Sequence, residues 1–192
     1  GLAVQDRTFN PDGTLKYLPN WEEHFFGDKL LVNGKVWPYL DVRRGKYRFR
    51  LLNGSTSRTY TFSLDRDDIP GGADMPFVQI GTDGGLLRAP VPGLDEILLA
   101  PAERVEVIVT ASLAAGSTAV LHGLPYDRGT MGMMGTSSTT IPLLTVNYTS
   151  SATAAIALPD ALNSIADLGV PTTTKRLVFS SGMGMGGMGG GM

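Results

Sequence analysis

The sequence contains no cysteine and only two histidines, His24 and His122. Without cysteine, the chain has no disulfide bond, no thiolate metal ligand and no cysteine nucleophile. A blue-copper centre needs one cysteine thiolate and two imidazoles, so this chain cannot supply such a centre by itself. The two histidines are far apart and neither has a histidine neighbour. We therefore predict ordinary roles for both: His24 exposed in a loop, and His122 hydrogen-bonded at the end of a strand.

Concentrated positive charge and long apolar runs are also missing. The 16 basic and 18 acidic residues give a net charge of -2 and form no basic stripe, which argues against a nucleic-acid partner. No run of about 18 apolar residues is present, so no membrane span is predicted. The first residues have neither the basic start nor the apolar region of a signal peptide. If the protein is exported, its signal is expected outside this chain.

Motifs for nucleophilic catalysis and phosphate binding are absent as well. No Gly-x-Ser-x-Gly segment is present, and neither histidine has a recognisable serine partner in the sequence. The glycine-rich segment 81–85 lacks the spacing and the lysine of a phosphate-binding loop, and a tight connection between strands explains it better. The sequence therefore predicts no catalytic residue in this chain.

What the sequence does contain is a series of short apolar segments separated by turn residues. In 46–52, Tyr47, Phe49 and Leu51 alternate with basic residues, which predicts a half-buried strand. Asn33-Gly34 between two apolar segments predicts a type I′ hairpin turn. Further strands are predicted at 30–32, 35–37, 58–64, 77–80, 96–99, 104–109, 119–122, 143–148 and 176–179. With 42% hydrophobic residues the chain has enough apolar material for a core.

One short helix is predicted at 159–168. It would place Leu158, Leu162 and Ile165 on one side, with a proline at its first position and a glycine after its end. The preceding serine-, threonine- and alanine-rich stretch is typical of a linker. The expected organisation is therefore a β-sandwich domain at 1–150. A connector at 151–192 would follow, with the helix, a last strand and a glycine- and methionine-rich tail.

Methionine is concentrated in two glycine-rich segments, which hold seven of the eight methionines. Thioether sulfur is a soft ligand that suits Cu(I). The alternative is that these segments are solvated linkers whose methionines bind nothing. The candidate Cu(I) ligands are Met131, Met133, Met134, Met183, Met185 and Met188.

Five segments carry a resemblance to a known family. They are 4–9, 27–40, 46–58, 79–87 and 99–104, and they occur in the family's order. Together they resemble the second cupredoxin domain of multicopper oxidases, in particular the bacterial group with spore-coat laccase and bilirubin oxidase. The resemblance covers most of the first 110 residues. It implies an all-β, cupredoxin-like Greek-key β-sandwich or barrel, here with one short helix in a C-terminal connector.

The resemblance also implies a role. Multicopper oxidases oxidise phenols, aromatic amines or metal ions and reduce O₂ to water, with copper held by their first and third domains. The second domain is a copper-free spacer that helps to wall the substrate approach. We therefore expect no copper ligand or other cofactor in this chain, and copper in the missing domains. The expected partners are cupredoxin domains 1 and 3 of the same protein, together with self-association through exposed interdomain surfaces. The whole protein is expected to be exported to the periplasm, the medium or the spore or cell surface.

Two alternatives stay open. The chain could be a standalone β-sandwich that binds or supports other molecules without an enzymatic parent. It could also be a Cu(I)-binding module that works through its methionines. The sequences flanking the chain distinguish the first alternative, and a Cu(I) titration distinguishes the second.

Overall fold

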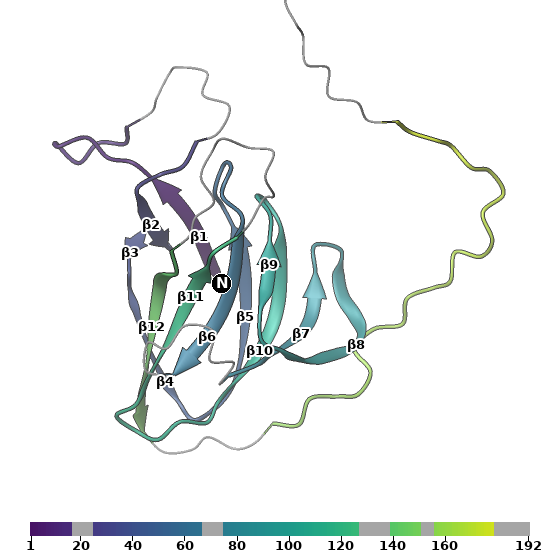
Figure 1. Cartoon of the computed structure of the whole chain (residues 1–192). Coiled ribbons are helices and arrows are strands. Elements are labelled where there is room, and N and C mark those ends of the chain that lie inside the picture. Colours follow the sequence, from purple (N-terminus) through teal and green to yellow (C-terminus); the bar gives the residue numbers. More distant parts are fainter. Residues whose placement is uncertain (17–24, 67–74, 127–138, 151–155, 179–192) are drawn as a thin grey trace, which may run out of the picture.

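Two β-sheets pack face to face in the computed structural model, which describes residues 1–16, 25–66, 75–126, 139–150 and 156–178 (Figure 1). The seven-stranded sheet contains, in spatial order, β3 (Lys35–Val36), β2 (Lys29–Val32), β1 (Leu2–Arg7), β5 (Gly45–Asn53), β10 (Arg104–Ala111), β7 (Phe77–Thr82) and β8 (Gly85–Leu94). The five-stranded sheet contains β4 (Tyr39–Arg43), β12 (Ile141–Ser150), β11 (Thr118–Leu124), β6 (Tyr60–Arg66) and β9 (Ile97–Leu99).

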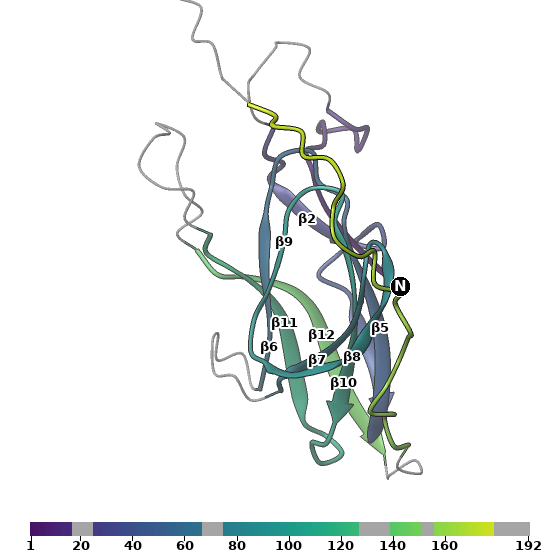
Figure 2. The ribbon, with the colours of Figure 1, turned by 90° about the vertical axis from the view of Figure 1, so that its right-hand side faces the viewer.

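Both sheets are mixed. β1 runs parallel to β5, and β4 runs parallel to β12, while the other neighbours are antiparallel. Successive strands often change sheet, as from β5 to β6 and from β9 to β10. Figure 2 shows the two layers, with β6, β9 and β11 on one side and β5 and β10 on the other. Among the described residues, none forms a helix long and apolar enough to cross a membrane.

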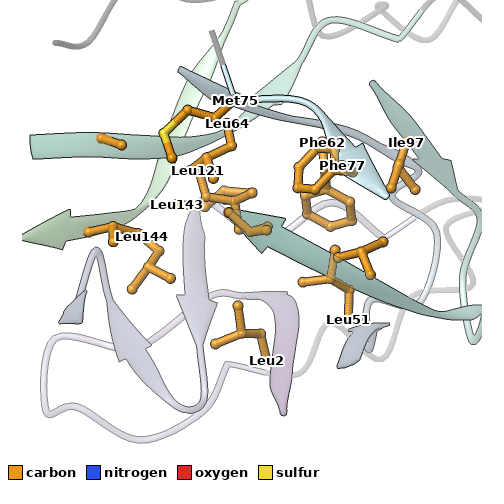
Figure 3. Close-up of a cluster of buried hydrophobic side chains, with 14 of the residues drawn as sticks. Leu2, Leu51, Phe62, Leu64, Met75, Phe77, Ile97, Leu121, Leu143 and Leu144 are labelled. Carbon is orange, nitrogen blue, oxygen red and sulfur yellow. The ribbon is translucent and has the colours of Figure 1, made fainter. Parts of the chain in front are cut away.

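The alternating patterns correctly predicted the strands that line the core. In β5 the basic residues are exposed, while Tyr47 and Phe49 pack against the core and Leu51 is buried. The core between the sheets includes Phe62 and Phe77, which are almost completely buried (Figure 3). Each such side chain contributes about 1.5–3 kcal/mol through burial, which makes this layer the main source of stability.

The Asn33-Gly34 turn is confirmed. Asn33 has φ 50° and Gly34 has φ 82°, and the turn joins the antiparallel strands β2 and β3. Positive φ at both central positions is what a type I′ turn requires. The strand predicted at 35–37 ends at Val36, because Trp37 also has a positive φ, of 41°.

The apolar patterns predicted neither β4 nor β8, and β1 was indicated only by the family resemblance of segment 4–9. β8 contains Pro90, Pro92 and Gly93, residues that normally interrupt a strand. Proline is tolerated there because β8 is the edge of the seven-stranded sheet, and neither Pro90 nor Pro92 is among the β8 residues in register with β7.

The helix predicted at 159–168 is wrong, and so is the strand predicted at 176–179 as far as the structure describes it. Residues 156–178 contain neither helix nor strand, and Phe179 lies outside the described residues. The segment passes β8 on the outside of the sandwich, where the Leu162 N–H donates to the Arg88 carbonyl at 2.9 Å (Figure 1). Ile165 and Leu168 are 44% and 98% exposed. A helix this short needs a packing surface to be stable, and on its apolar side only Leu158 and Leu162 are even partly buried.

Candidate functional site

His122 lies in a buried polar cluster on two neighbouring strands. It stands opposite Ser63 across the β6–β11 ladder, and Asp65 follows two residues later on the same face of the sheet. The His122 Nδ1 and Asp65 Oδ2 atoms are 2.9 Å apart, and the Ser63 hydroxyl donates to the same carboxylate oxygen at 2.6 Å. All three side chains are at most 3% exposed. His122 therefore hydrogen-bonds as predicted, but it lies inside β11 rather than at its end, and the sequence did not indicate its partner.

These three residue types also make up serine-hydrolase triads, but their order here is different. In a triad the imidazole lies between the serine and the carboxylate, so that it can take the serine proton. Here the Asp65 carboxylate lies between Ser63 and His122, because both bind its Oδ2 atom. The cluster is therefore a buried structural network rather than an activated nucleophile.

The described residues do not fit a copper centre. The copper centres expected from the family resemblance use several imidazole ligands, and a blue-copper centre also needs a cysteine thiolate. No group of three or more His, Cys, Asp or Glu side chains within the described ranges could hold a metal ion. His122 is a single imidazole with one nitrogen already at Asp65. His24 and the six candidate methionines lie outside the described residues.

A second buried cluster centres on Asp6, which is 0% exposed. Its Oδ2 atom accepts hydrogen bonds from the Gly27 N–H at 2.7 Å and from Arg58 Nε at 3.1 Å. The Arg58 guanidinium also donates to the Gly27 carbonyl and lies 5.2 Å from the centre of the Phe26 ring. A Cβ atom on Gly27 would come within 2.3 Å of the Arg7 backbone nitrogen, so only glycine fits there.

This ion pair was not predicted from the sequence, although part of its signal is visible there. Asp6 shares the inward face of β1 with Leu2 and Val4, where a carboxylate needs a buried partner. Its partner Arg58 is 52 residues away, and the outward-inward pattern of a strand cannot reveal that pairing.

A third group of polar contacts joins β5 to the start of β6. The Asn53 side-chain amide donates to the carbonyls of Arg58 and Leu99, at 2.7 and 3.0 Å. The hydroxyls of Ser55 and Tyr60 are 2.9 Å apart. Burial raises the pKa of Tyr60 to about 12, so this phenol is neutral at physiological pH. These contacts fix loops and strand ends, and none of them presents a reactive group to solvent.

Besides these buried polar clusters, the surface of the described residues carries a cleft and exposed apolar side chains. A cleft of about 360 Å³ opens beside the edge strand β9, and its lining includes Glu96, Leu98 and the Asp83–Arg104 ion pair. Large apolar side chains lie open at several places on the surface, and two groups of them are considered further. They are Val36, Trp37 and Tyr39 around β3 and β4, and Leu168, Val170, Leu177 and Val178 in the C-terminal segment.

The two mixed sheets define a cupredoxin-like β-sandwich, and solved structures agree. The multicopper oxidase McoA from Aquifex aeolicus superposes with a TM-score of 0.76 at 32% identity, over 88% of this chain and 35% of that one. A multicopper oxidase from Pediococcus acidilactici gives a TM-score of 0.71 at 31% identity, over 91% of this chain and 32% of that one. The predicted all-β, cupredoxin-like class is therefore confirmed, without the helix.

Sequence relatives point to the same family. A laccase of Bacillus subtilis is 46% identical over 132 residues, which are 62% of this chain and 24% of that protein. Multicopper oxidase LPR2 of Arabidopsis thaliana is 34% identical over 185 residues, 91% of this chain and 30% of that protein. No protein-family profile matches the chain. The chain is thus homologous to one segment of the multicopper oxidases and spans about a quarter to a third of the length of these relatives.

Proposed function

We propose that this chain is the copper-free middle cupredoxin domain of a three-domain multicopper oxidase, with the sandwich at 1–150 and a connector at 151–192. The observation that carries the proposal is the combination of partial coverage and missing ligands. The chain matches 24% of the Bacillus laccase and 35% of McoA, yet it has no cysteine. A segment with that fold but without the blue-copper thiolate fits a spacer better than a catalytic domain.

The whole protein would be an oxidoreductase that removes single electrons from phenols, aromatic amines or metal ions and uses them, with protons, to reduce O₂ to water. Its copper would be held by the domains on either side of this one, which would also be its main partners. By resemblance to the family, the whole protein would be exported. No step of the reaction is assigned to residues of this chain.

The contribution of this chain would be geometric. A spacer has to hold its neighbours at a fixed distance, and the buried polar clusters supply stiffness where strands meet loops. Asp6 ties β1 to the segment before β2 through the Gly27 N–H, and Arg58 ties both to the start of β6. Buried, charge-assisted contacts of this kind are shorter and stronger than neutral ones, which restricts movement of the joined segments.

Two measurements test this proposal. The gene product in cells should have a mass well above the 20.4 kDa of this chain. The isolated chain, loaded with copper, should show no intense thiolate-to-copper absorption and should not oxidise a phenolic dye. A gene product of 20.4 kDa, or dye oxidation by the isolated chain, would contradict the proposal and favour a standalone module.

The clustering of methionine supports a second candidate function, Cu(I) binding. Seven of the eight methionines lie in two glycine-rich segments rather than in the strands. A competition titration with a Cu(I) chelator would compare the chain with a variant in which Met131, Met133, Met134, Met183, Met185 and Met188 are leucine. Weaker binding in the variant supports the function, and equal affinity in both contradicts it.

A further inference from the structure

Asn-Gly pairs are chemically labile, and the sequence contains two of them, Asn33-Gly34 and Asn53-Gly54. The backbone nitrogen after an asparagine can attack the Cγ atom of the asparagine side chain. The new N–Cγ bond closes a succinimide ring, while the Cγ–Nδ2 bond breaks and ammonia leaves with the proton of the attacking nitrogen. Water then opens the ring at either carbonyl, which yields aspartate or isoaspartate. Glycine favours the attack because it has no Cβ atom to hinder it.

The first pair lies open at the end of a hairpin. Asn33 and Gly34 are both exposed, and they are the central residues of the type I′ turn between β2 and β3. Gly34 belongs to neither residue pair of the β2–β3 ladder. Apart from its chain neighbours, no atom of the described residues would lie within 4 Å of a Cβ atom on Gly34. The attacking nitrogen is therefore unhindered and lies outside the ladder that joins the two strands.

The contacts of the Asn33 side chain do not block the reaction. Its amide accepts a hydrogen bond from the Ala3 N–H at 2.9 Å and donates one to the Gly1 carbonyl at 3.0 Å. Both hydrogen bonds are exposed, so water can replace them when the side chain turns toward the Gly34 nitrogen. The free-energy cost of this rearrangement is small, because exposed groups exchange a protein partner for a water molecule.

The second pair is held in the interior. Asn53 is 0% exposed, and its amide donates to the carbonyls of Arg58 and Leu99. The Gly54 nitrogen, which would be the attacking atom, donates its own hydrogen bond to the Val4 carbonyl at 2.7 Å. Formation of a succinimide here would leave these carbonyls without their donors. Loss of buried hydrogen bonds costs far more than exchange of exposed ones, because no water takes the place of the lost partner.

We propose that Asn33 is a site of spontaneous deamidation in the folded protein and that Asn53 is protected from the same reaction. The two pairs are identical in sequence and differ in their surroundings, since one lies in an exposed turn and the other among buried carbonyls. The inference goes beyond the proposed function and does not depend on it, because it uses only contacts within this chain.

The reaction would change the hairpin. An aspartate side chain at position 33 has an oxygen where the amide nitrogen donates to the Gly1 carbonyl, so that hydrogen bond would be lost. Isoaspartate would add a carbon atom to the backbone of the turn, so Val32 and Lys35 could not keep their present register. Deamidation would therefore loosen β3, which is an edge strand of the seven-stranded sheet.

Two variants identify the attacking nitrogen. Gly34→Ala places a Cβ atom beside that nitrogen and should slow deamidation of Asn33 several-fold, in native buffer and in guanidinium chloride alike. Lys35→Ala is the matched control, since it changes the next exposed residue and leaves the reacting atoms as they are. Deamidation of Asn33 at equal rates in the two variants would contradict the assigned reaction.

Peptide mapping by mass spectrometry tests the inference on the 192-residue chain, incubated at mildly alkaline pH. In native buffer, Asn33 should deamidate at least about tenfold faster than Asn53, because Asn53 must first break buried hydrogen bonds. In guanidinium chloride the two asparagines should react at similar rates, since unfolding exposes both pairs. Equal rates in native buffer would overturn the inference. A preference for Asn33 that persists unchanged in guanidinium chloride would overturn it as well, because the fold would then not be its cause.

Discussion

At the scale of single residues, loss of the Arg58 side chain should destabilise the sandwich strongly. Its guanidinium is the described cation that pairs with the fully buried Asp6 carboxylate, at 3.1 Å. In Arg58→Met the carboxylate stays buried without that partner, so the free energy of unfolding should fall by about 3–5 kcal/mol. Chemical denaturation measures this change. The control is Arg48→Met, which breaks the more exposed pair with Glu106 and should cost no more than about 1 kcal/mol. Similar losses in both variants would contradict the prediction.

Two buried tyrosines should make the fold sensitive to alkali. Burial raises the pKa of Tyr60 and of Tyr148 to about 12, while the unfolded chain ionises its tyrosines near pH 10. Between these values the unfolded state binds fewer protons than the folded state. The free energy of unfolding should therefore be unaffected by these groups below about pH 10 and should fall as the pH rises from about 10 to about 12. Denaturation of the chain and of Tyr60→Phe across this range would show a smaller slope in the variant, and equal slopes would count against this assignment.

At the scale of elements, the strands were predictable and their pairing was not. Alternation in β5 or β10 is a local pattern, because each inward residue is buried whatever strand lies beside it. The polar clusters depend on contacts between distant residues, such as Asp65 and His122 at a separation of 57. β8 was missed because only an edge position makes its prolines acceptable.

The C-terminal segment shows how a correct local pattern can give a wrong element. Its apolar spacing suits a helix. In the structure, however, the Leu162 N–H donates a hydrogen bond to the Arg88 carbonyl on the edge strand β8. Leu162→Pro removes this donor, and Leu162→Ala keeps the donor while it shortens the side chain. Limited proteolysis should cut the segment 156–165 faster in the proline variant than in the alanine variant. The reason is that the proline variant lacks one hydrogen bond, which stabilises the attachment of the segment by about 0.5–1.5 kcal/mol. Equal cleavage rates would show that the N–H does not hold the segment.

At the scale of the whole molecule, several large apolar side chains of the described residues lie open to solvent. Leu168, Val170, Leu177 and Val178 are 98%, 89%, 77% and 76% exposed, and Val36, Trp37 and Tyr39 are also exposed. Surfaces of this kind mark interaction sites or promote aggregation. The isolated chain should therefore self-associate as its concentration rises, and sedimentation velocity should show a growing fraction of larger species. The double variant Leu168→Lys and Val170→Lys should reduce that fraction, while Lys35→Arg, which keeps the charge and adds no apolar surface, should leave it unchanged. A single monomeric species at high concentration would mean that these surfaces need no covering and would weaken the assignment of the chain as an interior domain.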